Sequence, residues 1–162
     1  MLQKKLPAGN FFGTDSNPLY DSNIIARYER EVDEAEKESS EERINECLLQ
    51  LSRARVHSKR HKDVELGIAM LEGSMNCTSD ILQFQRIIYL LAVGLYRRGD
   101  YSRSRHLADH CLKFVPDWRE AKNLKKAIED CIKKDEMFRL SIAATAFGAV
   151  GTLATTLLFR KK

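Results

Sequence analysis

The chain has 162 residues, of which 43% are hydrophobic and 31% charged, and its net charge is +4. This length and composition exclude a disordered chain and predict one folded domain with an appendage. Basic and acidic residues are interleaved, as in Glu29-Arg30-Glu31, so the sequence has no basic stripe of the kind that binds nucleic acid.

The four cysteines, Cys47, Cys77, Cys111 and Cys131, are far apart and form no C-x-x-C pair. The lysines near the N-terminus are not followed by the apolar run of a secretory signal. We therefore expect free thiols in a reducing compartment, with neither a disulfide framework nor a zinc site.

Residues 1–20 predict a flexible N-terminal arm. Pro7 and Pro18, together with two glycines between them, preclude one long helix. The arm also carries Phe11 and Phe12, which are costly to leave in water. Our hypothesis is that the arm folds over a binding groove as a removable lid.

Three helices are expected in the first half of the domain. The first runs from about Asn23 to Glu38, with apolar residues at helical spacing. A capping box of Ser39 and Glu42 predicts the start of the second helix, and Asp63 is the expected cap of the third.

Three more helices are expected in the second half. The fourth and most apolar runs from Phe84 to Arg98 and is ended by a Gly-Asp pair. Ser102 is the expected start of the fifth, and a capping box of Asp117 and Glu120 predicts the start of the sixth. No run alternates with the period of two that marks a strand, so the fold class is all-α.

The helices form two degenerate tetratricopeptide-like repeats. Leu51-Ser52 aligns with Leu91-Ala92 at a shift of 40 residues, and Gly67 aligns with Ser104 at a shift of 37. Because arrays normally need three repeats for stability, we expect the flanking helices to act as caps. The prediction is a cytosolic helical domain over residues 21–136.

Arrays of this kind bend, and the first helix of each hairpin lines the inner surface where partners usually dock. Aromatic side chains there offer rigid apolar area and Arg a forked donor, with Arg97 the best candidate. Alternatively, Tyr89 and Val93 only complete the core. The expected groove residues are Leu49, Arg53, Val56, His57, Tyr89, Val93, Tyr96 and Arg97.

Residues 140–159 contain neither a charge nor a proline. A helix of this length extends roughly 30 Å, about the thickness of a hydrocarbon core. The alternative, a buried core helix, would need a polar face, whereas only Ser and Thr hydroxyls are present here. We expect a transmembrane anchor over residues 137–159, with the large apolar residues Leu140, Ile142, Phe147, Val150, Leu153, Leu157, Leu158 and Phe159.

A short basic tail, Arg160, Lys161 and Lys162, follows the anchor. Because so little chain follows the segment, it would insert after synthesis and leave the domain in the cytosol, as in tail-anchored proteins. Small residues recur every four positions along the anchor, so two anchors could pack together in a homo-oligomer.

The sequence contains no recognisable catalytic motif. His57 and His61, like His106 and His110, are spaced to share a helical face, but no carboxylate or thiol at ligand spacing completes a metal site. A metal-dependent hydrolase would need bound zinc. The sequence otherwise predicts no catalytic residue, no cofactor, no metal and no small-molecule substrate.

Several stretches resemble the mitochondrial fission 1 proteins, and the plant members most closely. They are residues 67–72, 89–97, 121–124, 133–135 and the anchor stretch 144–151. The resemblance implies a tail-anchored receptor of the mitochondrial outer membrane, also found on peroxisomes. It would recruit a dynamin-related GTPase, directly or through an adaptor, and would itself hydrolyse nothing.

The main rival is a tail-anchored docking protein for chaperones, whose repeats clamp a C-terminal carboxylate. That clamp needs Lys and Asn one turn apart on the first inner helix. Leu49 and Arg53 occupy those places here, which argues against this rival but leaves other cytosolic partners open.

Overall fold

The computed structural model describes residues 20–38, 40–78 and 80–158, with side chains up to residue 140. Residues 1–19, which are all of the predicted arm and lid except Tyr20, lie outside this part of the chain. The described part is helical apart from turns and an isolated bridge between Tyr20 and Ser58. The helices are α1 Ser22–Glu38, α2 Glu41–Val56, α3 His61–Met75, α4 Ile81–Arg98, α5 Tyr101–Phe114 and α6 Arg119–Leu158.

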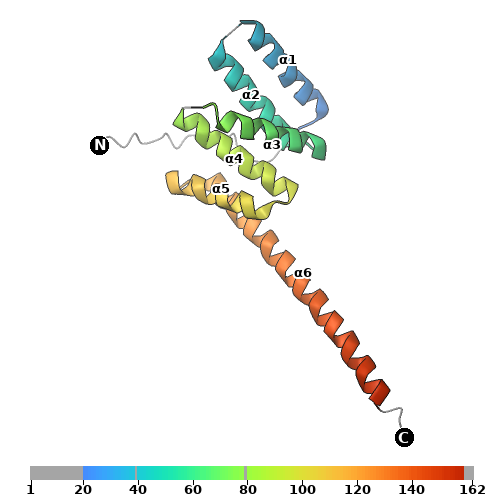
Figure 1. The fold of residues 1–162 in the computed structure, drawn as a ribbon. Coiled ribbons are helices and arrows are strands. Elements are labelled where there is room, and N and C mark those ends of the chain that lie inside the picture. Colours follow the sequence, from blue (N-terminus) through green and yellow to red (C-terminus); the bar gives the residue numbers. More distant parts are fainter. Residues whose placement is uncertain (1–19, 39, 79, 159–162) are drawn as a thin grey trace.

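Two helical hairpins, α2 with α3 and α4 with α5, form the centre of the bundle (Figure 1). Helix α4 also contacts α2 and the first part of α6, so α2, α4 and α6 are neighbours in one layer. Helices α1, α3 and α5 pack against members of that layer. This is the predicted tetratricopeptide-like arrangement, with α1 and α6 as the flanking helices.

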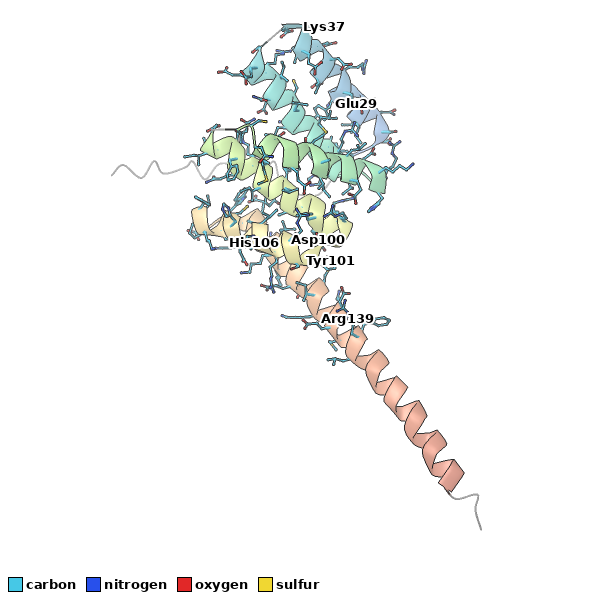
Figure 2. All side chains as sticks on the ribbon, viewed as in Figure 1. Glu29, Lys37, Asp100, Tyr101, His106 and Arg139 are labelled. Carbon is cyan, nitrogen blue, oxygen red and sulfur yellow. The ribbon has the colours of Figure 1, made fainter. Side chains whose placement is uncertain are left out.

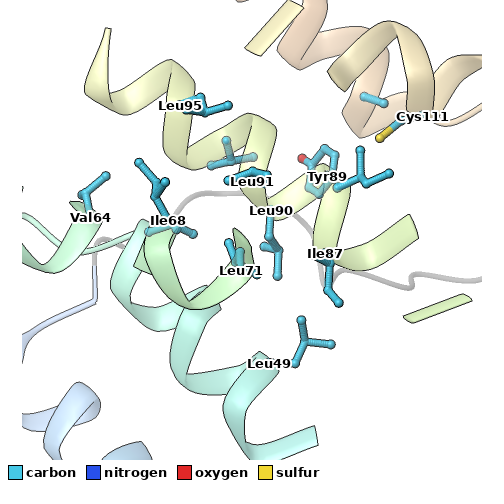
Figure 3. Packing of buried hydrophobic residues seen from close by; sticks show 14 residues of the cluster. Leu49, Val64, Ile68, Leu71, Ile87, Tyr89, Leu90, Leu91, Leu95 and Cys111 are labelled. Atoms are coloured by element: carbon cyan, nitrogen blue, oxygen red, sulfur yellow. The ribbon is translucent and has the colours of Figure 1, made fainter. Parts of the chain in front are cut away.

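The core is centred on α4, in which every residue from Ile87 to Leu95 is buried. Side chains from α2 and α3, including Leu49 and Leu71, pack against one side of α4, and Cys111 of α5 packs against another (Figure 3). A smaller apolar cluster joins α1 to α2. A helix apolar on so many sides must be surrounded, which explains the central position of α4.

Three helices come unusually close together at Val56, the last residue of α2. A Cβ atom at Gly67 of α3 would lie 2.8 Å from Val56 Cγ1 and 2.9 Å from the Val56 backbone nitrogen. A Cβ at Gly94 of α4 would lie 2.8 Å from Ile68 Cγ1. The two glycines therefore allow α2, α3 and α4 to pack at this distance.

Two of the predicted helix caps in the first half are corrected. Ser39 lies outside the described residues, and Ser40 is the N-cap of α2 without a side-chain capping bond. The N-cap of α3 is Arg60, so Asp63 lies in the first turn of the helix and is not its cap. Its carboxylate instead joins a buried polar network described below.

The starts of the last three helices also differ from prediction. Helix α4 begins earlier, after Asp80, whose carboxylate accepts hydrogen bonds from two backbone amides of the first turn. Asp100 caps α5 by accepting a hydrogen bond from the backbone N–H of Arg103, and the helix begins at Tyr101, one residue before the predicted start. Helix α6 begins at Arg119, and the Asp117 carboxylate accepts a hydrogen bond from the Lys122 side chain.

The sixth helix and the predicted anchor form one continuous helix of 40 residues, α6, which projects away from the bundle (Figure 1). The anchor was expected as a further helix after the sixth, so this part of the predicted architecture is corrected, whereas the limits of the anchor, residues 137–159, stay a prediction. Among the helical residues with described side chains, no segment is long and apolar enough to span a membrane. Leu140 is exposed, and the other predicted anchor side chains and the basic tail lie beyond the described side chains.

Candidate partner-binding face

The inner layer of α2, α4 and the start of α6 carries all of the predicted groove residues except His57, which directly follows α2. Arg53, Tyr96 and Arg97 are partly exposed. The other members of the set are buried: Leu49, Val56, His57, Tyr89 and Val93. The expectation of an open groove lined by the whole set is therefore corrected for these five side chains.

Four of the buried residues complete the core, and for Tyr89 and Val93 this is the alternative interpretation given above. Leu49, Val56, Tyr89 and Val93 all belong to the main apolar cluster around α4. The ring of Tyr89 also lies 4.8 Å from that of Trp118, just before α6, and this aromatic contact joins α4 to the last helix. These four side chains therefore pack beneath the inner face and do not line it.

Arg97 links the end of α4 to the turn between α2 and α3. Its Nη2 donates a hydrogen bond of 2.6 Å to the backbone carbonyl of Ser58. Within the described residues, its Nε is buried without a hydrogen-bond partner. Burial lowers the pKa of the Arg97 guanidinium, which still carries its charge at neutral pH. A cation held at the edge of an apolar layer is suited to bind an acidic or carbonyl group of a partner.

The chain enters the domain beside Arg97. The backbone N–H of Tyr20 donates to the carbonyl of His57 at 3.1 Å, and the two rings meet edge to face at 6.2 Å. Nδ1 of His57 donates to the carbonyl of Arg53 at 2.9 Å, since a carbonyl can only accept. The last residue of the predicted arm is thus fixed at one end of the inner face.

A polar network around the buried side chains of Ser58 and Asp63 holds this end of the face together, with the exposed Arg60 at its outer side. The Ser58 hydroxyl donates to the Asp63 carboxylate at 2.7 Å and accepts from the Arg60 backbone N–H at 3.1 Å. The Arg60 guanidinium donates twice to Asp63, at 2.9 Å each. Burial raises the pKa of Asp63, but the hydrogen bonds from Arg60 and Ser58 and the nearby positive charges outweigh it and lower that pKa overall.

We expect Asp63→Asn to lower the free energy of unfolding at neutral pH by about 2 kcal/mol, because it weakens charge-assisted hydrogen bonds at a buried site. Since the folded-state pKa of Asp63 lies below its unfolded value near 4, its stabilisation is present above that pH and lost as the pH falls below it. Urea unfolding at several pH values measures both effects. The matched control is Asp33→Asn, at an exposed position of α1; equal losses in the two variants would contradict the expectation.

Sequence reasoning missed an ion pair on the inner face. Arg86 of α4 lies 3.6 Å from Glu46 of α2, so the pair spans the two inner helices. The repeat register contains the signal for this pair, because positions 46 and 86 are separated by the same 40 residues that align Leu51 with Leu91. Equivalent residues of neighbouring inner helices lie side by side in such arrays.

The histidine pairs do not form metal sites in the described part of the chain. His57 is buried against its own helix, and His61 lies 3.4 Å from Glu65. His110 lies between the rings of Phe84 and Phe114. His57 and His61 therefore have separate contacts, and no third ligand of the kinds that hold metals joins either pair among the described residues.

A cavity of about 360 Å³ opens on the other side of the bundle, between α3, α4 and α5. Its floor is apolar, and an ion pair of 2.9 Å between Glu72 and Arg103 borders it. The lining residues are Glu72, Met75, Leu91, Arg103, His106 and Leu107.

Comparison with known proteins identifies the family of the chain. Residues 85–137 match the family model of the Fis1 C-terminal tetratricopeptide repeat. The mitochondrial fission 1 protein A of Arabidopsis thaliana is 51% identical over 147 residues, which cover 90% of this chain and 86% of that relative. The chain belongs to the mitochondrial fission 1 protein family. The predicted resemblance is confirmed, and by this membership the chain is not an enzyme.

Other relatives agree with this assignment. The mitochondrial fission 1 protein B of Arabidopsis thaliana is 44% identical, over 89% of this chain and 84% of the relative. The crystal structure of the fission protein Fis1 from Saccharomyces cerevisiae has the same fold, with a TM-score of 0.66 at 18% identity over 78% of this chain and 94% of that chain. Yeast Fis1 in complex with an Mdv1 fragment gives a TM-score of 0.63 at 17% identity, over 73% of this chain and 89% of that one.

Proposed function

We propose that the chain is a tail-anchored receptor that recruits dynamin-related GTPase machinery, directly or through an adaptor, and so promotes organelle division. The observation that carries the proposal is a protein-binding helical bundle of the fission 1 family whose last helix continues into an apolar segment. The anchor would hold it in the mitochondrial outer membrane and in peroxisomes, with the bundle facing the cytosol. Its contribution would be to raise the local concentration of partners at a membrane patch.

The partner-binding surface in this proposal is the inner face of α2 and α4. Yeast Fis1 has been solved with an Mdv1 fragment that contains an N-terminal extension and a coiled coil, which supports a helical partner for this chain. Arg53, Tyr96 and Arg97 are the predicted groove residues with exposed atoms, so they would touch the partner first. The buried members of the set would hold these three in place.

Arg97→Ala tests this surface. We expect its affinity for the recruited partner to fall at least about tenfold, because a hydrogen bond from a charged donor contributes roughly 1.5–3 kcal/mol. Co-sedimentation of full-length chain in membranes with cytosolic extract, followed by organelle length in cells, measures recruitment and division.

The control is Arg105→Ala, which removes an exposed arginine from α5. Losing the bond to Ser58 would cost Arg97→Ala about 1 kcal/mol of stability, so both proteins are compared well below their melting temperatures. Full recruitment by Arg97→Ala, or equal losses in both variants, would argue against the inner face as the docking site.

The arm remains the proposed lid of this face. Its attachment point supports the idea, since Tyr20 is hydrogen-bonded to His57 at the end of the face that holds Arg97. We expect deletion of residues 1–19 to tighten partner binding by about tenfold if the closed form dominates, because a binding-competent fraction of one tenth weakens apparent affinity by that factor. Unchanged affinity in a titration of the deleted and full chains would end the lid hypothesis.

A further inference from the structure

Helix α6 passes from the bundle into the apolar segment without a flexible joint. It is helical from Arg119 to Leu158, and no glycine or proline occurs between Arg119 and Phe147. Sharp helix kinks arise almost always at proline, at glycine or serine pairs, or at a π-bulge. The stretch that leaves the bundle, residues 129–140, contains none of these.

The first part of α6 is fixed in the bundle. Ala121 and Ile128 are fully buried. Lys125 Nζ lies 2.7 Å from Asp109 Oδ1 of α5, and the Tyr96 hydroxyl lies 3.8 Å from the Cys131 sulfur. The bundle therefore cannot turn about the axis of α6 without breaking core contacts.

The α4–α5 turn lies where α6 leaves the bundle. Tyr101, at the start of α5, packs against Tyr96 with ring centroids 5.8 Å apart, and the Tyr96 hydroxyl lies next to the sulfur of Cys131 in α6. Burial, together with the nearby Cys131 and Asp135, raises the pKa of the Tyr101 phenol. Figure 2 shows Asp100 and Tyr101 beside the departing helix, whereas Lys37 at the end of α1 lies at the opposite end of the molecule. From Cys131 to Leu140 the helix extends only about 13 Å at 1.5 Å per residue.

We propose that α6 is a rigid post that fixes the orientation of the bundle on the bilayer, with the α4–α5 turn next to the lipid headgroups and the α1–α2 turn farthest away. This inference depends on the tail anchor of the proposed function. Met137 and Leu140, which are 72% and 70% exposed, would then meet the membrane boundary instead of water. The inner face would point in one direction relative to the membrane, so that every receptor presents it alike.

Energy transfer to the membrane surface tests the orientation. The full chain is reconstituted into phosphatidylcholine vesicles that contain an acceptor dye on the headgroups, with a fluorescent amino acid at Ser102 or at Lys37, both of which are exposed. A bundle of this size is about 35 Å across. We expect at least twofold higher transfer from Ser102 than from Lys37.

A matched variant carries a seven-residue Gly-Ser insertion between Glu136 and Met137, which replaces the rigid exit by a flexible one. Its two probes should give nearly equal transfer. If the chain without the insertion floats with the vesicles but gives equal transfer from both probes, α6 does not fix the orientation of the bundle. That result would contradict the rigid post but not the membrane anchor. A chain that does not float with the vesicles would overturn the anchor and the post together.

Discussion

Gly67→Ala is expected to lower the free energy of unfolding by about 2–3 kcal/mol, although alanine is the better helix former by about 1 kcal/mol. The added Cβ would lie 2.9 Å from the backbone nitrogen of Val56, and a backbone atom cannot rotate away as a side chain can. The end of α2 would have to move from α3, which opens the core next to Ile68 and Leu71. Thermal unfolding should show a melting temperature lower by roughly 10 °C.

Two other glycines of the same bundle give matched controls. At Gly94 the nearest atoms are side-chain carbons of Ile68 and Val56, so Gly94→Ala should cost less than Gly67→Ala. At Gly73 no atom lies within 4 Å of the added Cβ, and Gly73→Ala should stabilise the helix by up to about 1 kcal/mol. The expected order of stability is therefore Gly73→Ala, wild type, Gly94→Ala, Gly67→Ala. A stable Gly67→Ala variant would show that α2 and α3 can separate at little cost.

The helices could be predicted from the sequence because the helical spacing of the apolar residues and the helix-breaking residues indicate the same segments. The Gly-Asp pair after Arg98 predicted the end of α4, and Gly99 indeed has a φ of 91° that other residues rarely adopt. The continuous apolar run of residues 87–93 predicted the most enclosed helix, which is α4. These signals are local, and tertiary packing reinforces them.

The caps could not be predicted as reliably, because short polar residues have several uses. In the sequence, Asp63 has the residue type of an N-cap and directly precedes an apolar run, as an N-cap would. In the structure its carboxylate instead binds Ser58 and Arg60. The hydrogen-bond partners of Asp63 depend on the conformation of the turn between α2 and α3. That geometry is set by tertiary contacts that the sequence pattern does not contain.

The groove was only partly predictable for a related reason. Repeat geometry selects the inner side of α2 and α4, but on a helix surrounded by neighbours the inner side and the core differ by a fraction of a turn. Leu49 and Val56 are on the core side of that division, whereas Arg53 keeps exposed atoms. The side chain type is the better guide here, since long cationic residues seldom lie fully buried.

The continuity of the sixth helix with the predicted anchor was missed because composition and helicity change at different places. The charged stretch of residues 133–136 resembles a linker in composition, but Lys and Glu are strong helix formers and no breaker follows. The helix therefore continues while its surroundings change from protein to solvent. In the proposed function, this stretch carries the bundle up to the membrane surface.

Removal of the final 25 residues, so that the chain ends at Met137, should abolish membrane association and reduce partner recruitment by at least about 100-fold. The reason is that membrane attachment confines receptors to a surface, and its loss returns them to bulk concentration. Cells that depend on the truncated chain should contain elongated organelles. Fractionation and microscopy measure the two effects.

The truncated bundle should still fold, because the α6 residues that complete the core, Ala121 and Ile128, are retained. Its melting temperature should stay within a few degrees of that of the full chain in detergent. Fusion of the truncated chain to an unrelated tail anchor should restore membrane association, which separates a defect in attachment from one in folding. A truncated chain that still sediments with mitochondria would contradict the anchor, because attachment would then come from the bundle or its partners.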